Sequence, residues 1–229
     1  KPVFGPSKQL DFELEMAFII NQNTEMGESI STKEAENAIF GMVVFNDWSA
    51  RDIQSWEYVP LGPFLAKNFG SSVSPWVVTL EALEPFRTAS PTQDPEVLDY
   101  LKFEGDKNYD INLEVYIQPE NGEENLISES NYKYMYWNMT QQLAHHTVNG
   151  CNLEVGDLYA SGTISGNDPK SYGSMLELTW RGENPITLNN GEERKFIEDN
   201  DTVTMKAWAE KDGVRVGFGE VSGKIIPTK

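Results

Sequence analysis

Several residue types are scarce in this sequence, and each scarcity excludes a class of protein. Cys151 is the single cysteine among 229 residues, so a domain held together by intrachain disulfides is excluded. No apolar run approaches the roughly 20 residues of a membrane-spanning helix, and nothing at the N-terminus has the pattern of a signal peptide. These features predict a cytoplasmic protein without a membrane partner.

Basic residues and histidines are also few. The 18 Lys and Arg residues face 36 Asp and Glu residues, which gives a net charge of −18. Because this charge repels phosphate backbones, we expect no nucleic-acid partner. The two histidines, His145 and His146, are adjacent in a predicted helix, where their side chains point about 100° apart. Stabilisation of a helix C-terminus is therefore a better interpretation of this pair than a zinc site.

Alternation of apolar and polar residues predicts a mainly β fold with few helices. Residues 10–18 and 174–180 have the pattern of strands, and hairpins are predicted over residues 110–130 and 201–226. A capping box of Ser31 and Glu34 predicts a short helix, before a buried strand over residues 41–45. The longest predicted helix covers residues 131–148.

The first strand carries a candidate cation site. Period two places Glu13 and Glu15 on one face of the strand, with their Cα atoms roughly 7 Å apart, close enough for both to bind one ion. The alternative is a solvent-facing edge strand, in which glutamates are common.

The stretch NDWSARDIQSWEYVPLGPFLAK, residues 46–67, concentrates polar side chains at helical spacing. With Ser49 as N-cap, one helical face contains Asp47, Arg51, Gln54 and Tyr58. Such a face supplies a metal ligand and several hydrogen-bond donors. The alternative is a solvated face with an ordinary ion pair between Asp47 and Arg51.

The end of this stretch is predicted to be a rigid loop. Pro60, Gly62 and Pro63 interrupt regular structure between Tyr58 and Lys67. If Lys67 is buried among its apolar neighbours, its ammonium group needs a carboxylate or a ligand oxygen. The alternative is a surface lysine that extends its charge into water.

Two further candidates lie in the final third of the chain. Small residues crowd positions 156–166 around Thr163, where the backbone can approach a ligand closely. The predicted strand over residues 174–180 places Glu177 on one face with Met175 and Thr179. Apolar neighbours on both sides of a carboxylate favour a functional role for Glu177.

Five ordered motifs resemble the fumarylacetoacetate hydrolase family. They are LDFELEMAF at 10–18, NDWSARDIQSWEYVPLGPFLAKNFGSSVSPWVV at 46–78, MYWNMTQQLAHHTVNGCNLEVGDLYASGTISG at 135–166, GSMLELTW at 173–180 and VGFGEVSGKIIP at 216–227. The resemblance implies a mixed β-sheet roll like the C-terminal domain of that family, paired as a homodimer. It also implies that residues 1–229 form one catalytic domain without the family's N-terminal domain and linking segment.

The resemblance implies a cation site with the following ligands. Glu13, Glu15 and Asp47 bind one divalent ion in the family, and a second ion lies beside Lys67 and Ser71. Serine stands at position 71 where threonine is common, so the hydroxyl is kept. Because the three ligands are carboxylates, we expect Ca²⁺ or Mg²⁺.

The implied reaction is hydrolysis of a carbon–carbon bond in 4-fumarylacetoacetate, a dianionic β-diketone acid, to fumarate and acetoacetate at the end of tyrosine and phenylalanine breakdown. Arg51, Gln54 and Lys67 have catalytic roles in the family, whereas Gln54, Tyr58 and Thr163 contact substrate. Glu177 orients a catalytic histidine that lies upstream of Glu13 in relatives. Residues 1–229 alone are therefore expected to be an incomplete catalytic unit. The alternatives are a decarboxylase or isomerase of the same superfamily, or a non-catalytic cation-binding module.

Overall fold

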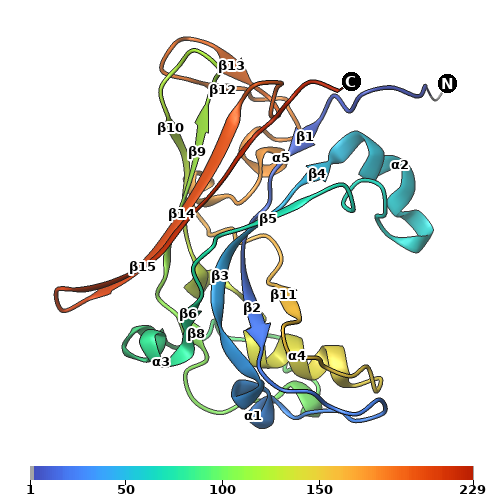
Figure 1. Ribbon diagram of the computed structural model, residues 1–229, viewed down its shortest axis with the longest axis vertical. Helices are drawn as coiled ribbons and strands as arrows, with labels where there is room; N and C mark the ends of the chain where they lie inside the picture. The colour runs from blue at the N-terminus through green and yellow to red at the C-terminus, as the bar shows by residue number, and fades with distance from the viewer. Residues whose placement is uncertain (1–2, 229) are drawn as a thin grey trace.

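The computed structural model describes residues 3–228, and two antiparallel sheets dominate it (Figure 1). The first sheet has the strand order β11–β2–β3–β5, and β6 also pairs with β3. Its strands are β2 (Leu14–Ile20), β3 (Ile39–Asp47), β5 (Ser71–Val73), β6 (Val78–Thr79) and β11 (Leu158–Ala160).

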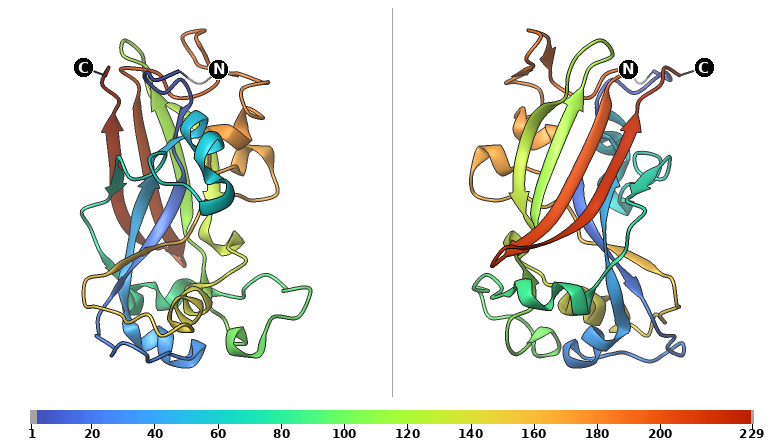
Figure 2. Two further views of the ribbon diagram at one scale, coloured as in Figure 1. Left: turned by 90° about the vertical axis from the view of Figure 1, so that its right-hand side faces the viewer. Right: turned by 60° about the vertical axis from the view of Figure 1, so that its left-hand side comes forward.

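The second sheet has the order β10–β9–β14–β15, and Figure 2 shows its four strands side by side. The strands are β9 (Asn112–Gln118), β10 (Asn125–Asn131), β14 (Thr202–Lys211) and β15 (Val214–Lys224). Both predicted hairpins are confirmed. The turn between β14 and β15 is Asp212–Gly213, and both residues have positive φ angles, of 52° and 78°, as a tight hairpin turn requires.

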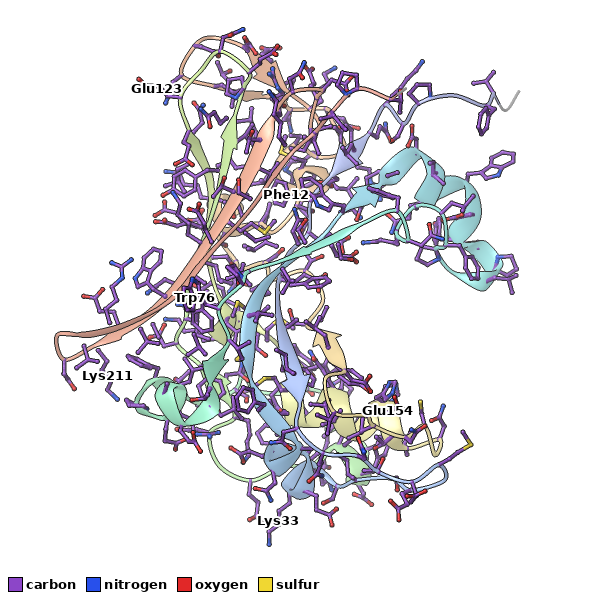
Figure 3. The ribbon with its side chains drawn as sticks, viewed as in Figure 1. Phe12, Lys33, Trp76, Glu123, Glu154 and Lys211 are labelled. Atoms are coloured by element: carbon purple, nitrogen blue, oxygen red, sulfur yellow. The ribbon has the colours of Figure 1, made fainter. Side chains whose placement is uncertain are left out.

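The core lies where the two sheets meet, with β14 and β15 packed against β3. It includes the fully buried side chains of Phe12, Leu14, Met16, Phe18, Met42, Leu113 and Phe218. Phe12, labelled in Figure 3, follows β1 in the chain, and its side chain is fully buried. Strand β2 is covered on both faces, so the polar face predicted for it does not contact solvent: Glu15 is 2% exposed and Ala17 is fully buried.

Short elements complete the fold. The helices are α1 (Thr32–Ala35), α2 (Arg51–Leu61), α3 (Leu80–Leu83), α4 (Met139–Thr147) and α5 (Met175–Leu178). Turns of 3₁₀ helix occupy Glu36–Ala38, Glu84–Phe86, Asp99–Leu101, Tyr132–Tyr134 and Pro169–Ser171. Three two-stranded ribbons pair β1 (Leu10–Asp11) with β4 (Ser49–Ala50), β7 (Arg87–Thr88) with β8 (Asn108–Tyr109), and β12 (Ile186–Thr187) with β13 (Glu193–Arg194).

The mainly β class is confirmed, but the sheets are not mixed. Every strand pair within residues 3–228 is antiparallel. The capping box of Ser31 and Glu34 forms as predicted at the start of α1. Among the described residues, every helix is too short or too polar to span a bilayer.

Three predicted elements have different bounds or a different type. The predicted strand over residues 10–18 is divided between β1 and β2, because β1 pairs with β4 whereas β2 pairs with β3. The helix predicted over residues 131–148 begins only after Asn138, whose side chain accepts from the Gln141 N–H and caps α4. Residues 175–178 form a helical turn and not a strand, because the Ser174 side chain caps it.

Candidate active site

Antiparallel pairing of β2 with β3 creates an acidic cluster. The register sets Leu14 opposite Asn46, and the Asp47 N–H donates to the Glu13 carbonyl at 3.3 Å. The carboxylates of Glu13, Glu15 and Asp47 consequently lie together, with one oxygen from each within 4.8 Å of the others. The structure thus brings the three predicted metal ligands to one place.

Lys67 neutralises part of this cluster. Its Nζ lies 2.7 Å from Glu13 Oε2 and 2.9 Å from Asp47 Oδ2, and it donates to Ser49 Oγ at 2.6 Å. The side chain is 19% exposed, so the alternative of a solvated surface lysine does not hold. Burial opposes ionisation of Glu13, but the hydrogen bond from Lys67 and the charge of Arg51 lower its pKa overall.

The loop that presents Lys67 is anchored by Glu57. Its carboxylate accepts from the backbone N–H groups of Phe64, Leu65 and Ala66 at 2.7, 3.2 and 2.9 Å. These hydrogen bonds lower the pKa of Glu57. Helix α2 is interrupted at Val59, the residue before Pro60, but helical structure continues to Leu61. The predicted loop therefore begins at Gly62 and not at Tyr58.

Arg51 is buried at the start of α2, and its ion-pair partners differ from the predicted one. Its Nε donates to Asp11 Oδ2 at 2.8 Å, and its Nη1 donates to Glu13 Oε1 at 2.7 Å and to Gln54 Oε1 at 3.0 Å. The predicted pair with Asp47 does not form, because Asp47 ends β3 and lies outside the helix.

Two details of the predicted helical face are also corrected. Ser49 is not the N-cap: it belongs to β4, and Ala50 precedes the helix without a side-chain cap. Tyr58 is 53% exposed, but it lines a cavity of about 480 Å³ together with Gln54 and Arg51. These three predicted residues therefore share one cavity, whereas Asp47 does not line it.

Glu177 and Thr163 line a second cavity, of about 460 Å³, whose lining also includes Arg51 and Glu13. Glu177 Oε2 accepts from Ser165 Oγ at 2.8 Å and from Ser174 Oγ at 3.0 Å. The prediction that this carboxylate has apolar surroundings is therefore wrong, because two hydroxyl groups donate hydrogen bonds to it.

Ser71 lies at the edge of the acidic cluster. It begins β5, where it pairs directly with Asp47, and its side chain is exposed. Its position beside Asp47 agrees with a ligand role, which stays a prediction.

Glu15 is the most strongly perturbed carboxyl of the cluster. Burial and the nearby charges of Glu13 and Asp47 raise its pKa to about 8, although it accepts from the Gly162 N–H at 2.9 Å. Without a cation, this group therefore holds a proton at neutral pH.

The charges around the cluster fit a divalent cation. Four carboxylates, those of Asp11, Glu13, Glu15 and Asp47, meet two cationic side chains, those of Arg51 and Lys67. When all are ionised the sum is two negative charges, which one divalent ion neutralises. Oxygen donors alone suit a hard cation.

Competition between the cation and the Glu15 proton gives a first testable prediction. Unfolded Glu15 has a pKa near 4.5, so the cation-free protein loses stability as the pH rises from about 4.5 through about 8. A cation displaces the proton and removes this loss. The rise in melting temperature on adding Ca²⁺ or Mg²⁺ to the full-length protein is therefore expected to be larger at about pH 8.5 than at about pH 6.

The matched control is Glu15→Gln, which holds no titrating proton and should show a much smaller difference between the two pH values. An equal rise in the wild-type melting temperature at both pH values would contradict the assignment of Glu15.

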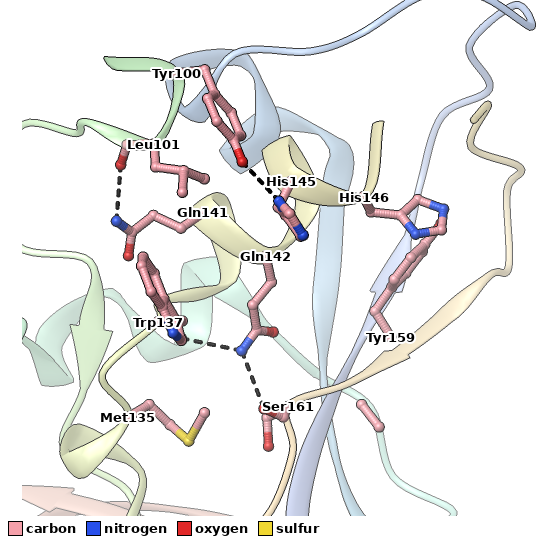
Figure 4. A pocket seen from close by; sticks show the side chains of 11 residues that line it. Tyr100, Leu101, Met135, Trp137, Gln141, Gln142, His145, His146, Tyr159 and Ser161 are labelled. Carbon is pink, nitrogen blue, oxygen red and sulfur yellow. Dashed lines mark hydrogen bonds between the residues drawn. The ribbon is translucent and has the colours of Figure 1, made fainter. Parts of the chain in front are cut away.

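A third cavity, of about 580 Å³, is lined by none of the three clustered carboxylates (Figure 4). Its lining includes His145 and His146, which occupy the last turn of α4 as predicted. His145 Nδ1 is 2.9 Å from the Tyr100 hydroxyl, and His146 packs edge-on against Tyr159. Neither histidine contacts the acidic cluster, in agreement with their exclusion from the predicted site.

Sequence reasoning missed three residues of this region. The strand pattern predicts no role for Asp11, the helical pattern predicts a cap at Ser49 and not a contact with Lys67, and no pattern indicates that Glu57 anchors the loop. Asp11 shares the period-two face of Glu13 and Glu15, and that spacing was the available signal for it.

The two sheets and the carboxylate cluster define a β-rich domain able to hold a divalent cation. The chain belongs to the fumarylacetoacetate (FAA) hydrolase C-terminal family, whose model matches residues 2–226. The family predicted from the sequence motifs is thereby confirmed.

Curated relatives are similar along the whole chain. The chain is 55% identical over 229 residues to fumarylacetoacetase of Arabidopsis thaliana, covering 100% of this chain and 54% of that protein. It is 55% identical over 227 residues to fumarylacetoacetase of Homo sapiens, covering 99% and 54%. The chain spans about half the length of these relatives.

Solved structures share the fold at lower identity. Fumarylacetoacetate hydrolase from Exiguobacterium antarcticum aligns with a TM-score of 0.60 and 21% identity, over 97% of this chain and 58% of that one. The 2-hydroxyhepta-2,4-diene-1,7-dioate isomerase from Mycobacterium marinum aligns with a TM-score of 0.54 and 19% identity, over 96% and 60%. At these identities the comparison concerns the fold only.

Proposed function

We propose that the full-length protein hydrolyses 4-fumarylacetoacetate to fumarate and acetoacetate, the last step of tyrosine breakdown, and that residues 1–229 are its catalytic domain. The observation that carries the proposal is the cluster of Glu13, Glu15 and Asp47 beside Arg51 and Lys67. The roughly 55% identity to proteins named fumarylacetoacetase supports this substrate over others handled by the same fold.

We assign the side chains as follows. A Ca²⁺ or Mg²⁺ ion held by Glu13, Glu15 and Asp47 would polarise the two diketone oxygens. Arg51 and Lys67 donate to the oxygen that becomes negative when water attacks the carbonyl carbon. The carbon–carbon bond then breaks, and the leaving carbanion takes up a proton to give acetoacetate.

The remaining assignments concern orientation and binding. Gln54, Tyr58 and Thr163 contact the substrate from the two cavities that Arg51 lines. Glu177 orients the histidine base that the family resemblance implies upstream of Glu13, and its contacts with Ser165 and Ser174 fix its own position. A second ion beside Lys67 and Ser71, a homodimer and a cytoplasmic location complete the proposal, the last because a single cysteine suits a reducing compartment.

Consumption of fumarylacetoacetate by the full-length protein tests the proposal directly. The wild type should convert it to equal amounts of fumarate and acetoacetate, measured by chromatography. Asp47→Asn should lose the bound cation and lower turnover by on the order of 10³-fold or more, because it removes one of three anionic ligands.

The matched control is Asp212→Asn, an exposed residue in the β14–β15 turn where asparagine also tolerates a positive φ angle. It should keep both the cation and the activity. Equal metal content in the wild type and Asp47→Asn would show that the cation site is misplaced. Absence of hydrolysis by the metal-loaded wild type would refute the substrate assignment.

A further inference from the structure

Asp11 connects Arg51 with the helical turn that carries Glu177. Its Oδ2 accepts from Arg51 Nε at 2.8 Å and from the Leu176 N–H at 3.0 Å, while its Oδ1 accepts from the Met175 N–H at 2.7 Å. Strand β1, the start of α2 and helix α5 therefore meet at one carboxylate.

This carboxylate is fully enclosed. Asp11 is 0% exposed and Arg51 is 7% exposed. Burial raises the pKa of Asp11, and its contacts with Arg51 and the two backbone N–H groups offset part of that rise. All three hydrogen-bond partners are donors, so the group acts as an acceptor in each contact.

The guanidinium of Arg51 is fixed on two of its three nitrogens. Asp11 holds Nε, and Glu13 and Gln54 hold Nη1. Within residues 3–228, Nη2 has no acceptor and is available to a ligand oxygen, since Arg51 lines both cavities of the site. A guanidinium is planar, so fixing Nε and Nη1 also fixes the direction of Nη2.

We propose that Asp11 is a positioning residue that sets the plane of the Arg51 guanidinium. Because Asp11 also binds the N–H groups of Met175 and Leu176, it fixes where that guanidinium lies relative to Glu177. Asp11 touches no substrate in this assignment and acts through Arg51 and α5. The inference rests on the proposed function, because its effect is measured on fumarylacetoacetate hydrolysis.

A second buried pair in the chain provides a matched control. Arg194 Nε donates to Asp201 Oδ2 at 2.8 Å, and Asp201 is 1% exposed. Asp201 also accepts from the backbone N–H of Glu198, so its hydrogen bonding resembles that of Asp11. None of these residues belongs to the site, so Asp201→Asn should reduce stability without changing turnover.

The experiment compares full-length Asp11→Asn with wild type and Asp201→Asn, well below their melting temperatures. Asp11→Asn is expected to lower kcat about 10- to 100-fold with KM changed less than about threefold, because a misdirected Arg51 loses contacts made mainly in the transition state. Asp11→Glu, which retains the charge but moves the carboxylate, should remain folded at the assay temperature and still lower kcat.

A double-mutant cycle separates positioning from general destabilisation. If Asp11 acts through Arg51, adding Asp11→Asn to Arg51→Met should lower kcat by less than about twofold. The proposal would be overturned if kcat were unchanged in Asp11→Asn and Asp11→Glu. It would also be overturned if Asp11→Asn lowered kcat by the same factor in the wild type and in Arg51→Met, or if Asp201→Asn lowered kcat as much as Asp11→Asn does. An inactive wild type would instead refute the proposed function, and this inference with it.

Discussion

Lys67→Met in the full-length protein is expected to lower kcat for fumarylacetoacetate by on the order of 10²-fold or more while the fold is preserved. Lys67 Nζ lies between Glu13 and Asp47, within 2.9 Å of both, and in the proposed mechanism it donates to the substrate oxygen that becomes negative. Methionine has a side chain of similar length but brings no charge or hydrogen-bond donor to the substrate oxygen. Steady-state kinetics measure the loss, and circular dichroism checks the fold.

The matched control for this substitution is Lys33→Met. Lys33 is an exposed residue of α1, outside the site, and methionine is a good helix former. Its kcat should equal that of the wild type. If Lys67→Met also leaves kcat unchanged, Lys67 has only a structural role in balancing the carboxylates.

Asp11→Ala is expected to destabilise the protein by about 3–5 kcal/mol. The substitution leaves the Nε of buried Arg51 and the N–H groups of Met175 and Leu176 without their acceptor. Each buried donor without a partner costs about 1–3 kcal/mol, and Arg51 retains only Glu13 to balance its charge. The shift of the urea unfolding midpoint measures this loss.

Asp106→Ala is the control for stability, because Asp106 is exposed and its carboxylate makes no hydrogen bond in the described structure. It should change the unfolding free energy by less than about 0.5 kcal/mol. A similarly small change in Asp11→Ala would show that water or neighbouring groups replace the lost acceptor.

Local patterns in the sequence determined much of the fold. The β9–β10 and β14–β15 hairpins and the Ser31 capping box depend on residues close together in the chain, so spacing alone predicted them. The period-two pattern also predicted that Glu13 and Glu15 share a face. The motifs identified the family, and with it Asp47 and Lys67 as partners of those glutamates.

Competing local contacts decided the elements that were predicted incorrectly. The residues around Glu177 alternate like a strand, but Ser174 caps them into a helical turn, to which Asp11 binds from far along the chain. The apolar spacing of residues 131–148 predicts one helix, but the Asn138 side chain caps the start of α4, so the helix begins at Met139.

Only the tertiary structure decided which charges meet. Asp11 and Met175 are 164 positions apart, and Glu15 and Gly162 are 147 positions apart, yet each pair forms a hydrogen bond. The pairing of β1 with β4 placed Asp11 beside Arg51. No local pattern encodes such contacts, because they depend on the register and packing of strands whose side chains are buried on both faces. Burial also placed Glu15, which the sequence could have put on a solvent-facing edge strand, in the interior beside Glu13 and Asp47, where its pKa is raised to about 8.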